Sequence, residues 1–247
     1  MGPSLPPRDG CAHPPVCPRW TLSPWGILLA AGARGVDVRV RSCQSRGMST
    51  TDRNPHTADE WDARYRDTDR LWTSDVNPAL PIEVSDLTPG TALEVGSGEG
   101  ADARWLADHG WQVTALDISQ VAVDRAREID TRPAITWLQA DLVADDVPGR
   151  DFALVTAHYF PIAAADVAVA RKLIDAVGPG GTLLMVAHAP EGVRAHGFDP
   201  ADYVQPDDIA EMLGDGWQVI THETRERGRP AGGGHHINDV VLRARRT

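Results

Sequence analysis

A glycine-rich turn near the middle of the chain carries the clearest chemistry in the sequence. It spans residues 94–100 and reads E-V-G-S-G-E-G. Glycines in such a turn let the backbone approach a ligand closely at the start of a helix. The turn also fits the dinucleotide-binding pattern G-x-G-x-x-A, through Gly96, Gly98 and Ala101. Glu94, however, would repel a pyrophosphate and attract a ligand that carries an ammonium or sulfonium group.

Two further carboxylates follow at the ends of the next two expected strands. Asp117 is placed to accept hydrogen bonds from both hydroxyls of a ribose, and Asp141 to accept one from an exocyclic amine. Together with Glu94, they suit a nucleoside with a cationic amino-acid tail and no phosphate. Each aspartate alone has a simpler interpretation, because Asp often caps a helix or forms a turn.

The elements around these residues alternate between strand and helix periodicity, which is typical of a βαβ chain. The expected strands cover residues 92–95, 111–116, 135–139, 152–156, 182–187, 217–221 and 237–244. The expected helices cover residues 57–72, 100–109, 120–129, 167–177 and 206–213. The link at 225–234 is too short for a crossover helix, so the last two strands should be antiparallel. We therefore predict an α/β fold with a seven-stranded, mostly parallel sheet, a C-terminal antiparallel hairpin and helices on both faces.

In these motifs the chain resembles the class I S-adenosylmethionine-dependent methyltransferases, whose fold is Rossmann-like. The resemblance rests on E-x-G-x-G-x-G at 94–100, Asp117, Asp141 and the G-P-G-G turn at 178–181, and it runs from about residue 57 to the C-terminus. It implies S-adenosylmethionine as cofactor, with Asp117 on the ribose and with Asp141 and Leu142 beside the adenine. The cofactor-binding residues that it implies in the sheet are Glu94, Gly96, Ser97, Gly98, Gly100, Asp117, Ile118, Asp141 and Leu142.

An aromatic-rich segment precedes the first expected strand. Its Trp61-Asp62-x-Arg64-Tyr65 motif and the later Asn77-Pro78 look like the small-molecule branch related to tellurite-resistance and thiopurine S-methyltransferases. We expect residues 57–80 to form a lid in which Trp61 and Tyr65 contact the cofactor. Aromatics at helical spacing are also common in hydrophobic cores, so a plain core role stays open.

Several absences narrow the acceptor of the methyl group. The turn after the fourth strand, residues 156–161, reads T-A-H-Y-F-P and not the N/D-P-P-Y of amino-directed methyltransferases. Residues 48–247 contain no cysteine, which enzymes that methylate carbon five of a pyrimidine need as nucleophile. The chain carries a net charge of −11, which disfavours binding to a phosphate backbone. These features indicate a small-molecule acceptor with a thiol, an oxyanion or a hydroxyl.

His158 and Tyr159 are the candidate catalytic residues, because they follow the fourth strand at the edge where open α/β folds bind ligands. Methyl transfer is an in-line displacement, and orientation is the main contribution of the protein. A sulfur, selenium or tellurium nucleophile needs little help from a base, whereas an oxygen nucleophile needs one with a pKa near neutrality. His158 is therefore either a general base or a residue that only fills the rim of the site.

We expect no metal, because His235, His236 and Asp239 are the one suggestive cluster and are better explained as strand-end residues. Residues 1–47 hold all three cysteines, seven prolines before residue 25 and a net charge of +4, which leaves −15 for residues 48–247. We interpret 1–47 as a disordered, basic, Pro-rich extension and 48–247 as the methyltransferase domain. A secretory leader and a cysteine-based zinc or disulfide pair are weaker interpretations of the extension.

Three functions are consistent with the sequence. The first is a small-molecule methyltransferase that is cytoplasmic and binds neither nucleic acid nor a membrane. The second is a nucleotide-dependent Rossmann oxidoreductase, which the G-x-G-x-x-A pattern favours and Glu94 opposes. The third is a protein that binds S-adenosylmethionine without catalysis.

Overall fold

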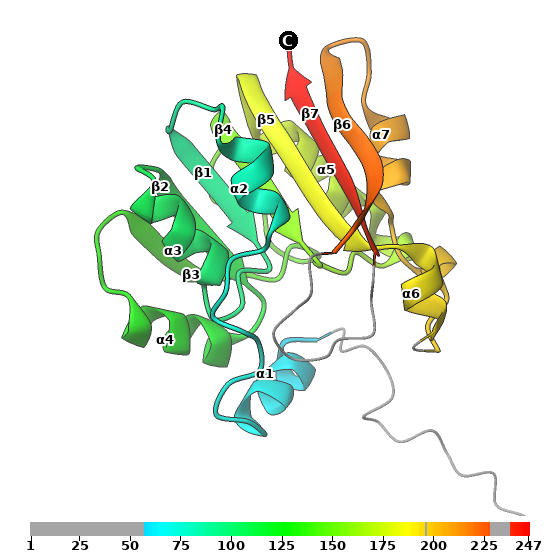
Figure 1. Ribbon diagram of the computed structural model, residues 1–247. Helices are drawn as coiled ribbons and strands as arrows, with labels where there is room; N and C mark the ends of the chain where they lie inside the picture. The colour runs from blue at the N-terminus through cyan, green and yellow to red at the C-terminus, as the bar shows by residue number, and fades with distance from the viewer. Residues whose placement is uncertain (1–56, 196, 228–237) are drawn as a thin grey trace, which may run out of the picture. The chain divides into compact units, whose positions relative to one another are not determined.

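A seven-stranded sheet forms the centre of the described part of the chain. The computed structural model describes residues 57–195, 197–227 and 238–247 (Figure 1). The sheet order is β3-β2-β1-β4-β5-β7-β6, with β7 antiparallel to both of its neighbours and the other pairs parallel. The strands are β1 (Thr91–Val95), β2 (Gln112–Asp117), β3 (Ile135–Gln139), β4 (Phe152–His158), β5 (Val177–His188), β6 (Trp217–Glu226) and β7 (Asn238–Arg246). The predicted α/β architecture is confirmed.

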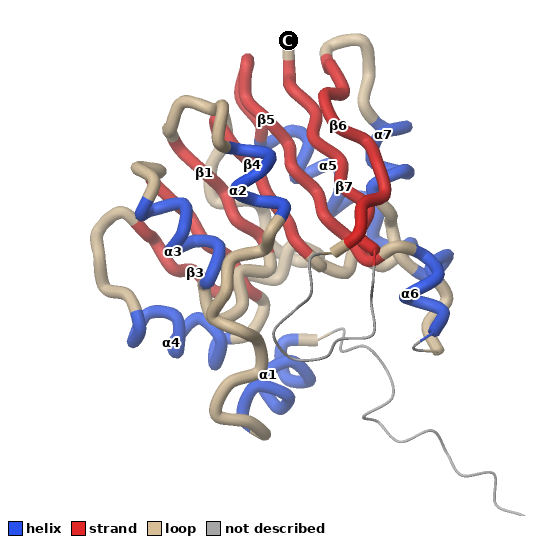
Figure 2. The backbone as a smooth tube through the Cα atoms, viewed as in Figure 1, coloured by secondary structure: helices blue, strands red, loops and turns tan. Residues whose placement is uncertain are grey.

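Helices cover both faces of this sheet, as expected (Figure 2). The helices of one layer are α2 (Ala79–Val84), α3 (Ala101–Asp108) and α4 (Gln120–Ile129). Those of the other layer are α5 (Val167–Ala176) and α7 (Pro206–Met212). Successive residues of β1 face opposite layers, because side chains alternate along a strand: Ala92 packs with the first layer, and Leu93 and Val95 with the second.

The carboxyl ends of the parallel strands meet at one edge of the sheet. The helices α1 (Ala58–Arg66) and α6 (Pro190–Ala195) lie at that edge (Figure 1). Two short 3-10 turns also follow the carboxyl ends of β4 and β5, and their bounds are Ala164–Asp166 and Pro200–Asp202. This edge is where open α/β sheets bind ligands.

The helix expected over residues 57–72 is shorter in the structure. It begins after Thr57, whose side chain forms a capping box with Glu60, and it ends at Arg66. The amide N–H groups of Leu71 and Trp72 both donate to the side chain of Glu99 at 3.2 Å. A helix that continued to Trp72 would need these two amides for preceding carbonyl groups, so their bonds to Glu99 are incompatible with the longer helix.

Residues 178–181, expected as a turn before the fifth strand, instead form the first part of β5. The preceding helix ends at Ala176, and the pairing of β5 with β4 slips between Phe152 and Leu154. A Cβ atom at Gly178 would lie 2.8 Å from Asp151 Cα, and one at Gly181 would lie 2.6 Å from the Phe152 oxygen. The glycines are therefore needed for close approach of two backbones, which helix periodicity does not reveal.

The two last strands extend beyond the expected 217–221 and 237–244. β6 is an edge strand that pairs only with β7, and most of its side chains are exposed on both faces. An edge strand that is exposed on both faces need not alternate polar and apolar residues. The sequence pattern therefore predicts too short a strand for β6. No helix in the described ranges is long and apolar enough to cross a membrane. The interpretations of residues 1–47, and of His235 and His236, lie outside the described residues.

Candidate active site

The glycine turn leaves β1 with its backbone in the left-handed region. Gly96 and Gly98 have φ of +73° and +53°, which residues with a side chain rarely adopt. A Cβ at Gly96 would lie 3.0 Å from Phe160 Cδ2, and one at Gly98 would lie 3.1 Å from Tyr65 Oη. The turn is thus contacted by aromatic residues from the segment after β4 and from α1.

Asp117 lies at the end of β2, directly beside this turn. Its two carboxylate oxygens accept 2.8 Å hydrogen bonds from the backbone N–H groups of Gly98 and Ser119. Burial raises the pKa of Asp117 to about 6, although these two hydrogen bonds oppose the rise. The carboxylate that the sequence assigned to a ribose therefore also holds the glycine turn, and a carboxylate has lone pairs for further donors.

Glu94 is a buried carboxylate in β1 without a full set of partners. It is 5% exposed, and its Oε2 atom has no hydrogen-bond donor among the described residues. Burial and the nearby charges of Asp102 and Asp117 raise the pKa of Glu94 well above its usual value. Three buried acids, Glu94, Asp102 and Asp117, lie near one turn, and Arg104 and His158 are the basic groups beside them. The unpartnered Glu94 oxygen therefore suits a ligand with ammonium and sulfonium groups. S-adenosylmethionine carries both.

The ends of β2 and β3 are held together beside Asp117. The Ala140 N–H donates to the Asp117 carbonyl at 3.0 Å, and the Gln139 side chain donates to the Ile118 carbonyl at 3.0 Å. Asp141 Oδ1 accepts from the Val143 N–H at 3.0 Å, as in a turn former, while Leu142 is buried. The structure thus brings the residues assigned to the ribose and the adenine to one side of the glycine turn.

The remaining residues of the turn have different surroundings. The Ser97 N–H donates to the Leu116 carbonyl at 2.8 Å, and its buried Oγ has no partner among the described residues. Gly100 is the N-cap residue of α3, and its φ is +80°. A Cβ there would overlap the Trp137 ring, so packing alone requires glycine at that position.

The aromatic segment lies on the glycine turn. Tyr65 is 2% exposed, and its Oη accepts a 2.8 Å hydrogen bond from Trp72 Nε1. Trp72 is 46% exposed, and the Trp61 ring lies 6.2 Å from the Tyr65 ring. Tyr65 is therefore both a packed residue and a direct neighbour of Gly98, and its contact with the cofactor stays a prediction.

Two acids for which the sequence motifs predicted no role, Asp62 and Glu99, bind this segment to the rest of the domain. Asp62 Oδ1 accepts hydrogen bonds from Ser119 Oγ at 2.6 Å and from the Val121 N–H at 3.1 Å. Glu99 binds the Leu71 and Trp72 amides through Oε2 and pairs with Arg125 at 3.1 Å through Oε1.

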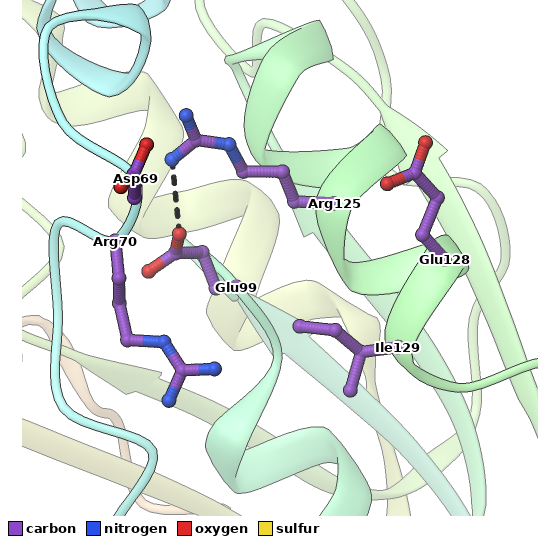
Figure 3. A pocket seen from close by; sticks show the side chains of 6 residues that line it. All are labelled: Asp69, Arg70, Glu99, Arg125, Glu128 and Ile129. Atoms are coloured by element: carbon purple, nitrogen blue, oxygen red, sulfur yellow. Dashed lines mark hydrogen bonds and ion pairs between the residues drawn. The ribbon is translucent and has the colours of Figure 1, made fainter.

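The Glu99–Arg125 pair forms one wall of a pocket of about 270 Å³ (Figure 3). The other lining residues are Asp69, Arg70, Glu128 and Ile129, from the segment after α1 and from α4. The Arg125 side chain also donates to the Thr68 carbonyl at 2.7 Å. This pocket is lined by charges of both signs and by the groups that attach the aromatic segment to α4, so we assign it to that attachment and not to the reacting groups.

His158 is buried, with both ring nitrogens engaged. Its Nδ1 lies 2.6 Å from Asp102 Oδ2 and its Nε2 lies 2.8 Å from Thr156 Oγ1, and its side chain is 6% exposed. Asp102 also accepts the Asn77 N–H at 2.7 Å, at the end of the aromatic segment. This geometry favours a positioning role for His158, and its role as a base stays a prediction.

Tyr159 follows with φ of +53°, a strained value for a residue with a side chain. Its hydroxyl donates to Asp239 Oδ2 at 2.7 Å, and its ring stacks on His188 with centroids 4.3 Å apart. Burial and the Asp239 carboxylate raise the pKa of Tyr159, so the phenol stays protonated. The described residues contain no group of three or more side chains suited to hold a metal ion.

Comparison with known proteins finds methyltransferases that are similar to the part of the chain that carries this site. Residues 92–181 match a family described as "Methyltransferase domain". An uncharacterised methyltransferase of Mycobacterium tuberculosis is 30% identical over 128 residues, which are 51% of this chain and 65% of that protein. A ribosomal RNA small subunit methyltransferase C of Alcanivorax borkumensis is 31% identical over 109 residues, which are 40% of this chain and 33% of that protein.

The fold has solved counterparts. The N-methyltransferase NodS of Bradyrhizobium japonicum, in complex with S-adenosyl-L-homocysteine, matches with a TM-score of 0.61 and 19% identity, over 77% of this chain and 99% of NodS. The chain thus spans about two thirds of the length of the mycobacterial relative and nearly all of the NodS structure. Residues 92–181 are thus similar to a methyltransferase domain, and the sheet that contains them has the fold of a solved methyltransferase that binds S-adenosyl-L-homocysteine.

Proposed function

We propose that this protein is an S-adenosylmethionine-dependent methyltransferase that acts on a small molecule in the cytoplasm. The observation that carries the proposal is Glu94, a buried carboxylate with an unpartnered oxygen among the described residues. An ammonium or sulfonium group would compensate its charge, whereas a pyrophosphate would add to the repulsion. The charge of the site therefore opposes the oxidoreductase alternative, and the family match opposes it independently.

Residues of the chain supply orientation for the reaction. The cofactor, when bound, supplies an activated methyl group on a sulfonium. Asp117 would bind the ribose of the cofactor, and Glu94 would bind its cationic amino-acid end. The residues that follow the carboxyl end of β3 would bind the adenine. Tyr65 and Trp72 cover the turn and exclude water, and water exclusion strengthens every polar contact inside the site.

A small acceptor is supported by charge. The chain has 35 acidic and 24 basic residues, and this excess of negative charge disfavours general binding to a polyanion. One relative is named a ribosomal RNA methyltransferase, and RNA is accordingly the competing acceptor. NodS is named an N-methyltransferase, which leaves nitrogen among the atoms to be assayed. We retain a thiol, an oxyanion or a hydroxyl as the acceptor group, attacked in line by its lone pair.

Isothermal titration calorimetry tests the cofactor assignment. We expect S-adenosylmethionine and S-adenosylhomocysteine to bind one per chain and NAD to show no heat of binding. Glu94→Gln should weaken S-adenosylmethionine at least tenfold, while Glu128→Gln, an exposed acid on α4, serves as matched control. Binding of NAD, or no binding of S-adenosylhomocysteine, would contradict the proposal.

Catalysis is tested separately by mass spectrometry of acceptors incubated with S-adenosylmethionine. A panel of thiols, phenols, amines and metalloid oxyanions should yield a methylated product together with S-adenosylhomocysteine. Methylation of ribosomal RNA but of no small molecule would replace the acceptor class. Tight cofactor binding with no transfer to any acceptor would support the binding-protein alternative.

A further inference from the structure

A second polar cluster lies at the carboxyl edge of the sheet, beyond the ends of β4 and β5. It consists of Tyr159 after β4, His188 at the end of β5, Asp239 in β7 and Arg227 after β6. None of the residues assigned above to cofactor binding belongs to this cluster. Phe160, the residue after Tyr159, lies against Gly96, so the cluster borders the same site.

Asp239 is the centre of the cluster. It is 3% exposed, and its Oδ2 accepts the Tyr159 hydroxyl at 2.7 Å and lies 3.7 Å from Arg227 Nε. Its Oδ1 has no hydrogen-bond donor within range in the part of the chain that is described, but His188 Nδ1 lies 3.5 Å away. A buried carboxylate oxygen without a donor is costly, and a small rotation of the imidazole would satisfy it.

His188 is held in orientation and partly open to solvent. Its ring stacks on Tyr159 with an interplanar angle of 19°, and its side chain is 27% exposed, against 6% for His158. A carboxylate on Nδ1 fixes the tautomer in which Nε2 accepts a proton, which is how a base is prepared in acid–base enzymes. Catalytic hydrogen bonds are often long without ligands and shorten when they bind.

We propose that His188 is the general base of this methyltransferase, that Asp239 and Tyr159 position it, and that the acceptor is a hydroxyl group. This inference rests on the proposed function and selects among its acceptors, because a thiolate or an oxyanion needs no base. His188 Nε2 takes the hydroxyl proton while the oxygen lone pair forms the bond to the methyl carbon. The carbon–sulfur bond breaks with its electron pair left on sulfur, and the imidazolium later releases the proton to water.

The first test requires no acceptor. Nitrogen-15 NMR of the imidazole rings in the full chain, with S-adenosylhomocysteine bound, reports which ring nitrogen carries the proton. We expect His188 to be protonated on Nδ1 when neutral, and Asp239→Asn to shift the proton to Nε2. His222, which pairs with Asp207 on the surface, is the internal control and should not change. A His188 ring protonated on Nε2, or one unaffected by Asp239→Asn, would overturn the proposal.

The second test measures methylation of p-cresol and of its matched thiol, 4-methylbenzenethiol. His188→Ala should lower kcat for p-cresol at least about 100-fold, the usual contribution of a general base, with little effect on the thiol. Added imidazole should restore part of the lost rate, and His222→Ala should behave as wild type. Tyr159→Phe, which removes only the hydroxyl, should lower kcat less than His188→Ala.

The outcomes separate this inference from the proposed function. Turnover of the thiol but not of p-cresol, or full activity of His188→Ala, would overturn the assignment of His188 and leave the methyltransferase intact. If the wild-type protein did not bind S-adenosylhomocysteine, the proposed methyltransferase function itself would be overturned. If neither probe is turned over, the tautomer measurement decides whether the dyad exists. Circular dichroism and calorimetric binding of S-adenosylhomocysteine show that each variant is folded.

Discussion

Asp62 and Ser119, separated by 57 positions in the sequence, form a buried 2.6 Å hydrogen bond that joins α1 to the start of α4. Ser119 is also the N-cap of α4, because its Oγ accepts the Ala122 N–H at 3.1 Å. Asp117 precedes it by two residues and binds its backbone N–H. The aromatic segment is therefore attached to the same short loop that would hold the ribose.

A double-mutant cycle measures that attachment. Asp62→Ala, Ser119→Ala and the double variant should show a coupling of about 1–2 kcal/mol in the free energy of unfolding, as expected for a buried hydrogen bond to a charged group. Urea denaturation gives the values. Asp59→Ala, an exposed acid on the same helix, should be additive with Ser119→Ala. Additivity of Asp62→Ala and Ser119→Ala would show that the contact contributes nothing.

Asp117→Ala should weaken cofactor binding by about 2–4 kcal/mol through the loss of charge-assisted hydrogen bonds to the ribose. Asp117→Ala should also be less stable than the wild type, because the Gly98 and Ser119 amides would lose their hydrogen-bond acceptor. Asp117→Asn retains an oxygen acceptor and should fold better than Asp117→Ala. Calorimetry and urea denaturation separate the two effects, and a loss of stability with unchanged affinity would indicate a purely structural aspartate.

Tyr65→Ala tests whether the aromatic segment is a lid. Aromatic faces attract cations, so this variant should weaken S-adenosylmethionine more than the neutral-sulfur S-adenosylhomocysteine. Cofactor should also protect residues 57–78 from proteolysis. If Tyr65 has only a core role, the variant should cost about 3 kcal/mol or more of stability with equal effects on the two ligands. Protease protection that does not change with cofactor would reject the lid.

Cofactor affinity should depend on pH below neutrality. The pKa of Asp117 is raised to about 6 and that of Glu94 is raised well above its normal value, and only their ionised forms attract a cation. Affinity for S-adenosylmethionine should therefore fall as the pH falls from 7.5 to 5.5. Titration calorimetry across that range measures it, and Glu94→Gln should flatten the dependence.

Stability without cofactor should change in the opposite direction. A carboxyl group whose pKa is higher in the folded than in the unfolded protein stabilises the fold at low pH. That stabilisation is lost as the pH rises through the folded pKa, at most about 1.4 kcal/mol per pH unit for one group. Urea denaturation of the cofactor-free protein and of Asp117→Asn at pH 5 and 7 compares the contributions. A wild type that gains no stability relative to Asp117→Asn at the lower pH would contradict the raised pKa.

The extension proposed at residues 1–47 is tested by deletion. A chain that begins at Met48 should bind the cofactor with unchanged affinity and melt within about one or two degrees of the full-length protein, because the extension differs from the rest of the chain in its charge, its proline content and its cysteines. Differential scanning calorimetry measures the change. A large fall in Tm would show that the extension packs on the domain.

Local pattern was sufficient to predict much of the fold and part of the site. The bounds expected for β3 and α4 agree with the structure, because each has a complete apolar pattern and α4 has the Ser119 cap. The glycine turn and Asp117 were predictable because their conformations depend on neighbouring residues. Glu99 and Asp62 were missed because their partners lie 26 to 59 positions away, and one sequence gives no signal for such contacts.

His158 illustrates the same limit at the site. Its position after a strand indicated a residue at the ligand edge, and the structure places it there. The sequence could not show that Asp102, 56 positions away, and Thr156 engage both nitrogens of its ring. The length of α1 was overestimated for a related reason, because Glu99 binds the amides that a longer helix would need.

The position of β7 between β5 and β6 has a consequence for the order of assembly during synthesis. β6 has no other strand to pair with, and β7 leaves the ribosome after every strand that it joins. Strands β1 to β4, with the glycine turn and Asp117, can therefore assemble on the ribosome while the sheet still ends at β5. The insertion of β7 completes the sheet and brings Asp239 beside His188 and Tyr159. The residues assigned to the cofactor are thus synthesised before the second polar cluster is complete, and the described sheet cannot be completed until β7 has been made.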